Sequence, residues 1–208
     1  SVFGVEKIDP FVVIADKEIL AQAKVPTNHE DVLQSILSAL DKVLLDGVAQ
    51  KLQRVVISST IVTNALTENK IDPVFLAVMT GPGMNVKGKF PVTPYYVSGY
   101  VDHRGKITAQ IDWTKHRDLL NTKGSGVCAV SGKFAVRQPQ NEYLLEHELK
   151  KCGYKKVFLG SELSGELNFV RRTNSAYFAA AVYKVFDKFC QKVQLALGNR
   201  GITAPVHI

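Results

Sequence analysis

Apolar and polar side chains follow two different periods along the first part of the chain, and these periods predict a hairpin and then a helix. An apolar run at residues 11–15 and a β-forming segment at 18–24 predict two strands that turn at residues 16–17. Apolar side chains then recur every three or four positions through residues 32–44, after a Thr-Asn-His-Glu capping box at 27–30. This spacing predicts an amphipathic helix that ends before Gly47.

The next apolar runs predict a sheet that is at least partly parallel. Residues 55–57 are typical of a buried strand, a helix is predicted through Leu66, and residues 73–79 form a second apolar run. A strand, a helix and a strand in this order are expected to form one parallel, right-handed unit. Between residues 80 and 104, the Gly81-Pro82-Gly83 cluster and several β-forming residues predict an excursion of loops and antiparallel strands.

Regular alternation of helices and strands resumes in the second half of the chain and implies another parallel unit. The predicted elements are a short helix near 113–120, a strand at 127–131, a helix at about 141–151, a strand at 156–159, a long helix at about 173–197 and the start of a strand at 205–208. Gly198 or Gly201 is expected to end the long helix. A weak domain boundary is expected near residues 160–165.

The composition of the 208-residue chain is that of a globular protein, because 46% of its residues are hydrophobic. No apolar run approaches the ~20 residues that a membrane-spanning helix needs, and no secretion signal begins the sequence. We therefore expect a cytoplasmic protein that does not bind membranes. The three cysteines are too widely spaced for a disulfide framework or a zinc site and are expected to be small buried residues.

A formal net charge of +7 raises the question of nucleic-acid binding. The lysines and arginines are spread along the chain and do not cluster with aromatic residues on one element. The densest group, at residues 150–156, is typical of a helix end, where cations complement the helix dipole. No nucleic-acid partner is predicted.

Small polar side chains mark a candidate ligand site where the predicted strand at 55–57 gives way to a helix. Ser59, Thr60, Thr63 and Asn64 follow this strand, and the helix start offers unpaired N–H groups that could hold an anionic or carbonyl ligand. The same residue types also cap helices without any ligand. The spacing alone leaves both interpretations open.

Three other groups are candidates for the same kind of site. Arg171 and Arg172 precede the long helix and could fork onto a carboxylate or phosphate, or form surface ion pairs. Asp102 and His103 could form a titratable cluster, but Asp-His-Arg-Gly is equally a turn signature. Arg137 could contact a ligand or anchor its own loop. The histidines lack metal-ligand spacing, so no metal site is predicted within the chain itself.

Several stretches of the chain together resemble one known family. They are residues 54–66, Thr-Gly-Pro-Gly-Met-Asn at 80–85, Asp-His-Arg-Gly at 102–105, Gly-Lys-Phe-Ala-Val-Arg at 132–137 and residues 163–173. In this order they resemble the amino-terminal part of the hydantoinase A/5-oxoprolinase family, ATP-dependent enzymes of the actin-like superfamily. The resemblance implies an α/β fold, a ribonuclease-H-like lobe with a mixed, partly parallel sheet. It also implies an N-terminal domain at residues 1–160 and the start of a truncated hydantoinase A domain at 161–208.

The resemblance further implies a reaction. Family members couple ATP hydrolysis, with magnesium, to the opening of a cyclic amide or imide such as a hydantoin or oxoproline ring, usually with a B-type subunit. Phosphorylation of the amide oxygen would supply the activation that water attack on an unstrained amide lacks. Related members carboxylate ketones, which is an alternative activity. The resemblance assigns no catalytic residue here.

The residues that the resemblance places in the substrate or nucleotide cleft come from several parts of the chain. They are Asp9, Ser59, Thr60, Thr63, Asn64, Gly81, Gly83, Asp102, His103, Arg137, Arg171, Arg172 and Thr173.

Two departures from the family pattern bear on function. The glycine-rich phosphate turn that opens family members is missing between Phe3 and Asp9, through degeneration or because about four residues are omitted after Val5. Asp9 aligns with the closing aspartate of that motif. The second phosphate motif and second lobe, which follow residue 208 in the family, are also missing. We therefore expect the chain alone to be inactive and to bind ATP weakly or not at all, and a non-catalytic regulatory or interaction subunit is a further alternative.

Overall fold

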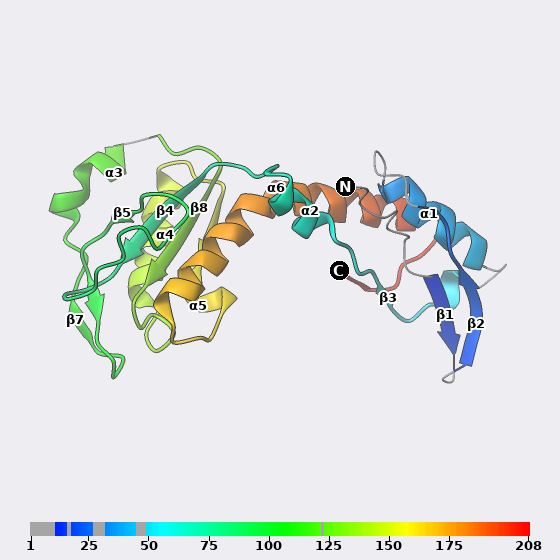
Figure 1. Ribbon diagram of the computed structural model, residues 1–208, viewed down its shortest axis with the longest axis horizontal. Helices are drawn as coiled ribbons and strands as arrows, with labels where there is room; N and C mark the ends of the chain where they lie inside the picture. The colour runs from blue at the N-terminus through cyan, green and yellow to red at the C-terminus, as the bar shows by residue number, and fades with distance from the viewer. Residues whose placement is uncertain (1–10, 16–17, 27–31, 45–48, 122) are drawn as a thin grey trace, which may run out of the picture. The chain divides into compact units, whose positions relative to one another are not determined.

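The computed structural model describes residues 11–15, 18–26, 32–44, 49–121 and 123–208. The chain forms two compact units: a terminal unit made of Ser1–Val62 and Val185–Ile208, and a sheet unit made of Thr63–Lys184. The helices α2 (Ile61–Thr67) and α6 (Phe169–Gly198) each contribute residues to both units (Figure 1). The predicted turn at 16–17, the capping box at 27–30, Gly47 and Asp9 lie outside the described residues.

The sheet unit is built on a four-stranded parallel sheet with the strand order β5-β4-β8-β9. The strands are β4 (Val74–Met79), β5 (Tyr95–Tyr96), β8 (Val127–Gly132) and β9 (Lys156–Leu159). Val74 lies opposite Val127 and Met79 lies opposite Gly132, so β4 and β8 are in register over their whole length. Their carboxyl ends therefore meet at one edge of the sheet.

Helices and a hairpin surround this sheet. The remaining elements of the sheet unit are the antiparallel strands β6 (Tyr100–Val101) and β7 (Ile107–Ala109), the 3-10 helix η2 (Trp113–His116), and the helices α3 (Arg117–Asn121), α4 (Gln140–Lys151) and α5 (Gly160–Leu163). Asn168 Oδ1 accepts a hydrogen bond from Arg171 N at 3.1 Å, which caps the start of α6. The helix begins four residues earlier than the spacing predicts, at Phe169.

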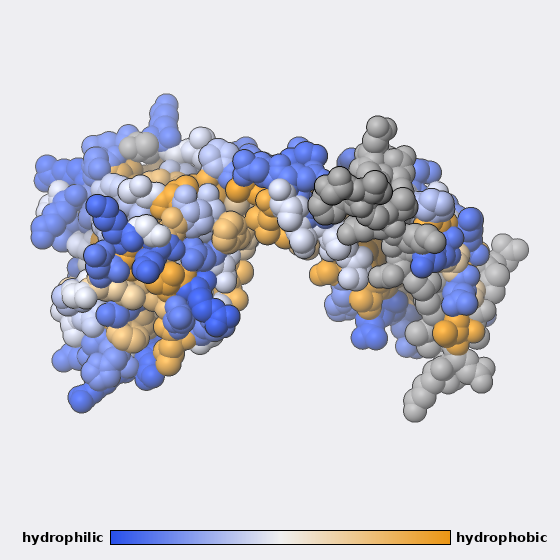
Figure 2. All heavy atoms as spheres, viewed as in Figure 1, coloured by the Kyte–Doolittle hydropathy of each residue, from blue (hydrophilic) through white to orange (hydrophobic). Residues whose placement is uncertain are grey.

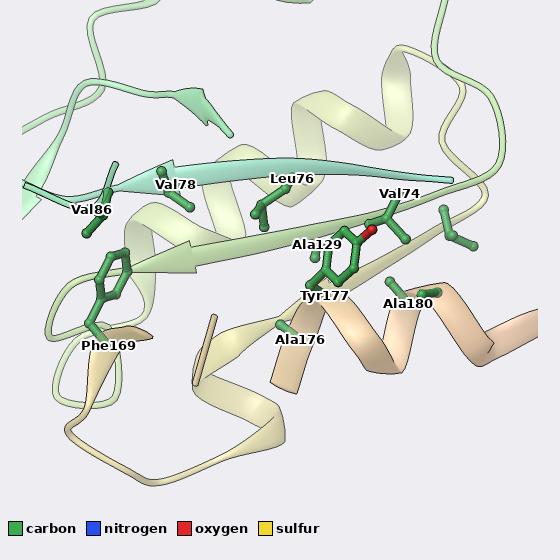
Figure 3. Packing of buried hydrophobic residues seen from close by; sticks show 11 residues of the cluster. Val74, Leu76, Val78, Val86, Ala129, Phe169, Ala176, Tyr177 and Ala180 are labelled. Carbon is green, nitrogen blue, oxygen red and sulfur yellow. The ribbon is translucent and has the colours of Figure 1, made fainter. Parts of the chain in front are cut away.

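Successive side chains of β4 point to opposite faces of the sheet, and each face has its own core. On one face, Leu76 and Val78 pack against Ala176, Tyr177 and Ala180 of α6 (Figure 3). The small alanine side chains let α6 lie close to the sheet. On the other face, the core consists of Ala77, Met79, Cys128 and Val130 from the strands with Leu145 and Leu149 from α4. The sheet is thus covered by a helix on each face.

The terminal unit contains two short ladders and one apolar core. Its elements are β1 (Phe11–Ala15), β2 (Glu18–Ala23), α1 (Val32–Val43), the 3-10 helix η1 (Ala49–Lys51), β3 (Val55–Val56) and β10 (Val206–His207). β1 and β2 are antiparallel, whereas β10 and β3 are parallel. Leu40 of α1, Ile57 after β3 and Val193 of α6 are buried in the same core.

Several element predictions are confirmed, and one pairing is wrong. The hairpin of β1 and β2, the helix α1, and the parallel pair of β8 and β9 around α4 are confirmed. The prediction that β3, α2 and β4 form one parallel unit is wrong, because β3 pairs with β10 and β4 pairs with β5 and β8. Neighbouring strands in sequence pair in only about two-thirds of cases. Here Val55 N donates to Pro205 O, so the partner of β3 comes from far along the chain.

The predicted excursion at 80–104 is antiparallel only in part. β6 and β7 form an antiparallel hairpin, but β5 adds a parallel strand beside β4. No helix in the described residues is both long and apolar enough to cross a membrane. On the face shown in Figure 2, hydrophilic residues are interspersed with apolar ones.

Candidate functional site

The carboxyl ends of β4, β8 and β9 form the candidate site of the sheet unit. After β4 the chain turns toward β5 on one side, and after β8 it enters α4 and continues to β9 on the other side. Such a reversal of direction is the place where open parallel sheets bind ligands. The first turns of α4 and α6 supply side chains at the same edge.

Glu142, in the first turn of α4, is the central carboxylate of this edge and is fully buried. Its Oε1 accepts a hydrogen bond from Gly132 N at 2.7 Å. Its Oε2 accepts hydrogen bonds from Ser161 N at 3.0 Å and from Ser161 Oγ at 2.5 Å. Burial raises the pKa of Glu142, while these donors and the charge of Arg172 favour the carboxylate. Glu142 thus ties α4 to the ends of β8 and β9.

Arg172, in the first turn of α6, is the matching cation and is also fully buried. Its Nη2 donates to Gly132 O at 2.7 Å and its Nη1 donates to Glu166 O at 2.5 Å. Burial lowers the pKa of Arg172, and the charge of Glu142 opposes that shift. An arginine nevertheless stays protonated in proteins. The guanidinium therefore fixes the loop before α6 to the end of β8.

Hydroxyl groups complete the contact between α6 and the sheet. Thr173 Oγ1 lies 2.8 Å from Ser131 Oγ and 2.7 Å from Phe169 O, and both hydroxyl side chains are fully buried. Gly160, at the end of β9, packs closely beside them, because a Cβ there would lie 2.7 Å from Ser131 Oγ. A larger residue at this position would push α5 away from β8.

A small hollow opens beside Glu142, between β6 and the loop that leads into α4. It is lined by Gly99, Tyr100, Lys133, Gln138, Asn141 and Glu142, among others. Asn141 is only 3% exposed, and neither its Oδ1 nor its Nδ2 has a hydrogen-bond partner among the described residues. Buried polar groups are normally paired, so this carboxamide is exceptional.

The structure brings some of the predicted site residues to this edge. Arg172 and Thr173 lie there and contact Gly132 and Ser131. Gly81 follows β4 with a φ of +65°, and a Cβ on it would lie 2.0 Å from the Tyr100 ring. Gly83 has a φ of +74° and open space around its Cα.

Asp102, His103 and Arg137 lie in neighbouring turns. Asp102 Oδ1 accepts hydrogen bonds from Arg104 N and Lys106 N, both at 2.9 Å, which is the geometry of a turn. These bonds hold the pKa of Asp102 below its ordinary value, and His103 beside it is exposed. A Cβ on Gly105 would lie 3.3 Å from Arg137 Cβ, so this turn packs against the loop after β8.

Other predicted residues make contacts outside the network of Glu142 and Arg172. Arg171 is exposed, with its Nε 3.5 Å from Glu166 Oε2. Ser59 Oγ accepts a hydrogen bond from Ile61 N at 3.2 Å, as a helix cap does. Ser59 and Thr60 belong to the terminal unit, whereas Thr63 and Asn64 belong to the sheet unit.

The sequence analysis missed Asn141, Glu142, Ser131 and Ser161. The available signal was the pair Asn-Glu two residues after Pro139, at the start of a helix that follows a buried strand. Among the described residues, no group of three or more His, Cys, Asp or Glu side chains could hold a metal ion. These residues by themselves therefore do not fit a bound metal.

Comparison with known proteins identifies the family to which the chain belongs. A sequence model of the hydantoinase/oxoprolinase N-terminal region matches residues 4–153. The chain belongs to this family. The resemblance identified from the motifs is therefore confirmed. No curated protein sequence matches the chain.

Two solved structures of low sequence identity share the fold of this family member. An ATP-dependent caprolactamase from Pseudomonas jessenii matches with a TM-score of 0.69 and 15% identity, over 95% of this chain and 33% of that protein. A nucleotide-free acetone carboxylase matches with a TM-score of 0.66 and 16% identity, over 86% of this chain and 31% of that protein. The chain thus spans about a third of the length of each.

Proposed function

We propose that this chain is the N-terminal part of an ATP-dependent hydrolase that opens cyclic amides or imides. The observation that carries the proposal is the family match over residues 4–153, which includes β4, β8 and α4 of the candidate site. The caprolactamase, whose fold is shared over 95% of this chain, supports a cyclic amide as the substrate class. The proposed fold class is the ribonuclease-H-like lobe of such enzymes, in a cytoplasmic protein.

The chemistry explains why ATP would be needed. An unstrained amide resists attack by water, and transfer of a phosphoryl group to its oxygen creates a better electrophile. Magnesium would arrive with the nucleotide phosphates, since the described residues lack a cluster for the ion alone. In this reaction the chain would bind and orient the nucleotide and the cyclic substrate.

We assign separate roles to the proposed site residues. Gly81 and Gly83 present backbone at the end of β4, and the exposed guanidinium of Arg171 is available to an anionic group. Arg172 acts as a positioning residue, because it already donates to two backbone carbonyls. The other proposed contacts to nucleotide or substrate are Asp9, Ser59, Thr60, Thr63, Asn64, Asp102, His103, Arg137 and Thr173.

A ketone carboxylase is the second candidate, and the shared fold with acetone carboxylase favours it. The deciding assay measures ADP release by this chain together with its companion B-type subunit or domain. Hydantoin, 5-oxoproline and caprolactam are tested in turn, and acetone with bicarbonate is tested separately. Release of ADP that depends on a cyclic amide supports the hydrolase, and release that depends on acetone and bicarbonate supports the carboxylase. Absence of turnover with either class would favour a non-catalytic subunit.

The isolated chain is a separate test of the same proposal. We expect calorimetry to detect weak ATP binding or none, and micromolar affinity would contradict this expectation. Peptide mass spectrometry across residues 5–9 would show whether a glycine-rich peptide lies between Val5 and Glu6. Such a peptide would supply the phosphate-binding turn that the hydrolase needs.

A further inference from the structure

His116, at the end of η2, is a buried histidine that the proposed function does not use. Its side chain is only 6% exposed, and both ring nitrogens have partners. Nε2 lies 2.9 Å from Ser98 N and also 2.9 Å from Ser98 Oγ. Nδ1 lies 3.2 Å from the Tyr95 hydroxyl oxygen, which lies 2.8 Å from Asp118 Oδ1. The ring therefore joins β5 and the segment after it to η2 and α3.

The donors around the ring determine which nitrogen carries the proton. A backbone N–H can only donate, so Nε2 accepts the hydrogen bond from Ser98 N and carries no proton. The proton of the neutral ring is then on Nδ1, which donates to the Tyr95 oxygen. Burial and the hydrogen bond to Asp118 raise the pKa of Tyr95 to about 12, so the Tyr95 hydroxyl stays protonated and donates to Asp118. One arrangement of protons thus satisfies all of these groups.

A second arrangement exists for the protonated ring. A proton on Nε2 would face the N–H of Ser98, so the hydrogen bond between them is lost. Nε2–H then donates to Ser98 Oγ, which lies equally close. Ser98 Oγ already accepts a hydrogen bond from Asp112 N at 2.8 Å, and it has a second lone pair for this bond. Protonation therefore exchanges one hydrogen bond of Ser98 for another.

The titratable groups that face the ring come from two elements. Tyr95 faces it from β5, and Asp118 lies behind Tyr95 on α3. The hydrogen bond from Tyr95 lowers the pKa of Asp118, so Asp118 is a carboxylate, and its negative charge favours a protonated ring. The carboxylate of Asp112, before η2, is paired with Lys115. Histidine is the side chain that ordinarily changes its charge between about pH 5 and pH 8.

Ser98 lies two residues before Tyr100, whose ring packs against the turn after β4. A Cβ on Gly81 would lie 2.0 Å from that ring, so the Tyr100 ring and Gly81 are in contact. Gly81 is one of the residues of the proposed site. The hydrogen bond from Ser98 N to His116 Nε2 holds the chain just before Tyr100. A change at His116 therefore reaches the candidate site through a short piece of chain.

We propose that His116 is a pH-sensitive switch for the segment that carries Tyr100. The neutral ring holds Ser98 N, whereas the protonated ring releases it and binds Ser98 Oγ. This release lets the Tyr100 ring shift on Gly81 as the pH falls, and so changes the surface at the end of β4. The switch depends on the geometry of these side chains and does not require the proposed hydrolase activity.

The test is an NMR titration of the 208-residue chain between about pH 5 and pH 8. Long-range nitrogen-proton spectra should show an unprotonated His116 Nε2 at the high end and two protonated ring nitrogens at the low end. The signals of the Ser98 amide and the Tyr100 ring should move with the same midpoint as the His116 ring. Exchange protection of the Ser98 amide, relative to its intrinsic rate, should fall by about tenfold, as expected for one lost hydrogen bond.

His116→Gln keeps an acceptor for Ser98 N but cannot take a positive charge. It should therefore remove the pH dependence of the Ser98 and Tyr100 signals. His147→Gln is the matched control, because His147 is exposed on α4, and it should leave both responses unchanged. If His116→Gln does not fold, Asp118→Asn provides a second variant. It removes the charge that favours the protonated ring, so the His116 midpoint should move to lower pH.

The inference is overturned if Nε2 carries a proton at about pH 8, or if the ring does not titrate between about pH 5 and pH 8. It is equally overturned if His116 titrates while the Ser98 and Tyr100 signals stay unmoved. A pH response that persists in His116→Gln, or an unchanged midpoint in Asp118→Asn, would also contradict it. None of these results bears on the proposed function, which is tested by ADP release with the companion subunit.

Discussion

Replacing Arg172 with methionine tests whether the buried polar network holds the carboxyl edge of the sheet together. The change removes a fully buried guanidinium that donates to Gly132 O and Glu166 O and lies beside Glu142. Each charged hydrogen bond of this kind contributes roughly 1.5–3 kcal/mol. The attraction between this charge and the buried Glu142 carboxylate would be lost as well. We therefore expect the free energy of unfolding of the sheet unit to fall by about 3–5 kcal/mol, mainly from the two hydrogen bonds.

The neighbouring substitution Arg171→Met is the matched control. Arg171 is exposed and its Nε lies 3.5 Å from Glu166 Oε2 in a surface ion pair, so its loss should cost no more than about 0.5 kcal/mol. Urea unfolding can be followed by the fluorescence of Trp113, the single tryptophan, which packs against the core of the sheet unit. This probe reports on the sheet unit even if the terminal unit unfolds separately.

The effect of Arg172→Met should also depend on pH. The positive charge of Arg172 favours the Glu142 carboxylate, so its removal raises the pKa of Glu142 further above the ordinary value. A carboxyl group whose folded pKa is raised contributes stability below its unfolded pKa and loses that contribution as the pH rises. Relative to the parent chain, the variant should therefore lose more stability as the pH rises above 4.5, the ordinary pKa of glutamate. A loss equal to that of Arg171→Met, or a loss that is the same below and above pH 4.5, would refute the reasoning.

Two further predictions concern single contacts in the sheet unit. Gly81→Ala should destabilise the sheet unit by about 2–4 kcal/mol, because a Cβ at φ +65° is strained and would lie 2.0 Å from the Tyr100 ring. The control Gly83→Ala should cost only about 1–2 kcal/mol, for its φ of +74°. Equal losses of stability in urea unfolding would contradict this prediction. Burial and the hydrogen bond to Asp118 raise the pKa of Tyr95 to about 12, so absorbance at 295 nm should show one tyrosine ionising late, and Asp118→Asn should bring it forward.

The sequence predicted best those elements that form apolar runs. The run at 127–131 became β8 (Val127–Gly132), in which every residue is buried, and the run at 156–159 became β9 (Lys156–Leu159), in which Val157 and Leu159 are buried. In such strands the apolar run is itself the signal. No comparable signal in the sequence shows which strand will pair with which. The pairing of β3 with β10 joins Val55 to Val206, two residues far apart in the sequence, which periodicity cannot reveal.

The sequence indicated some residues of the candidate site and missed others. Its position at the carboxyl ends of parallel strands follows from topology, and Arg172 and Thr173 were among the predicted residues. Glu142 was missed because a glutamate in the first turn of a helix is usually exposed and favoured there by the helix dipole. Only the packing of α4 against β8 shows that this carboxylate is buried.

The buried charges of Glu142 and Arg172 are best understood through the elements that they position. Apolar side chains of similar volume can stabilise a fold as well as buried charges do, so stability alone does not explain charges at this place. The hydrogen bonds of Glu142 to Gly132 and Ser161 fix the first turn of α4 against two strands. Arg172 fixes the loop before α6 to the end of β8 in the same way, through Gly132 O and Glu166 O. Directional hydrogen bonds of this kind hold the carboxyl edge of the sheet in one arrangement, which apolar packing alone specifies less strictly.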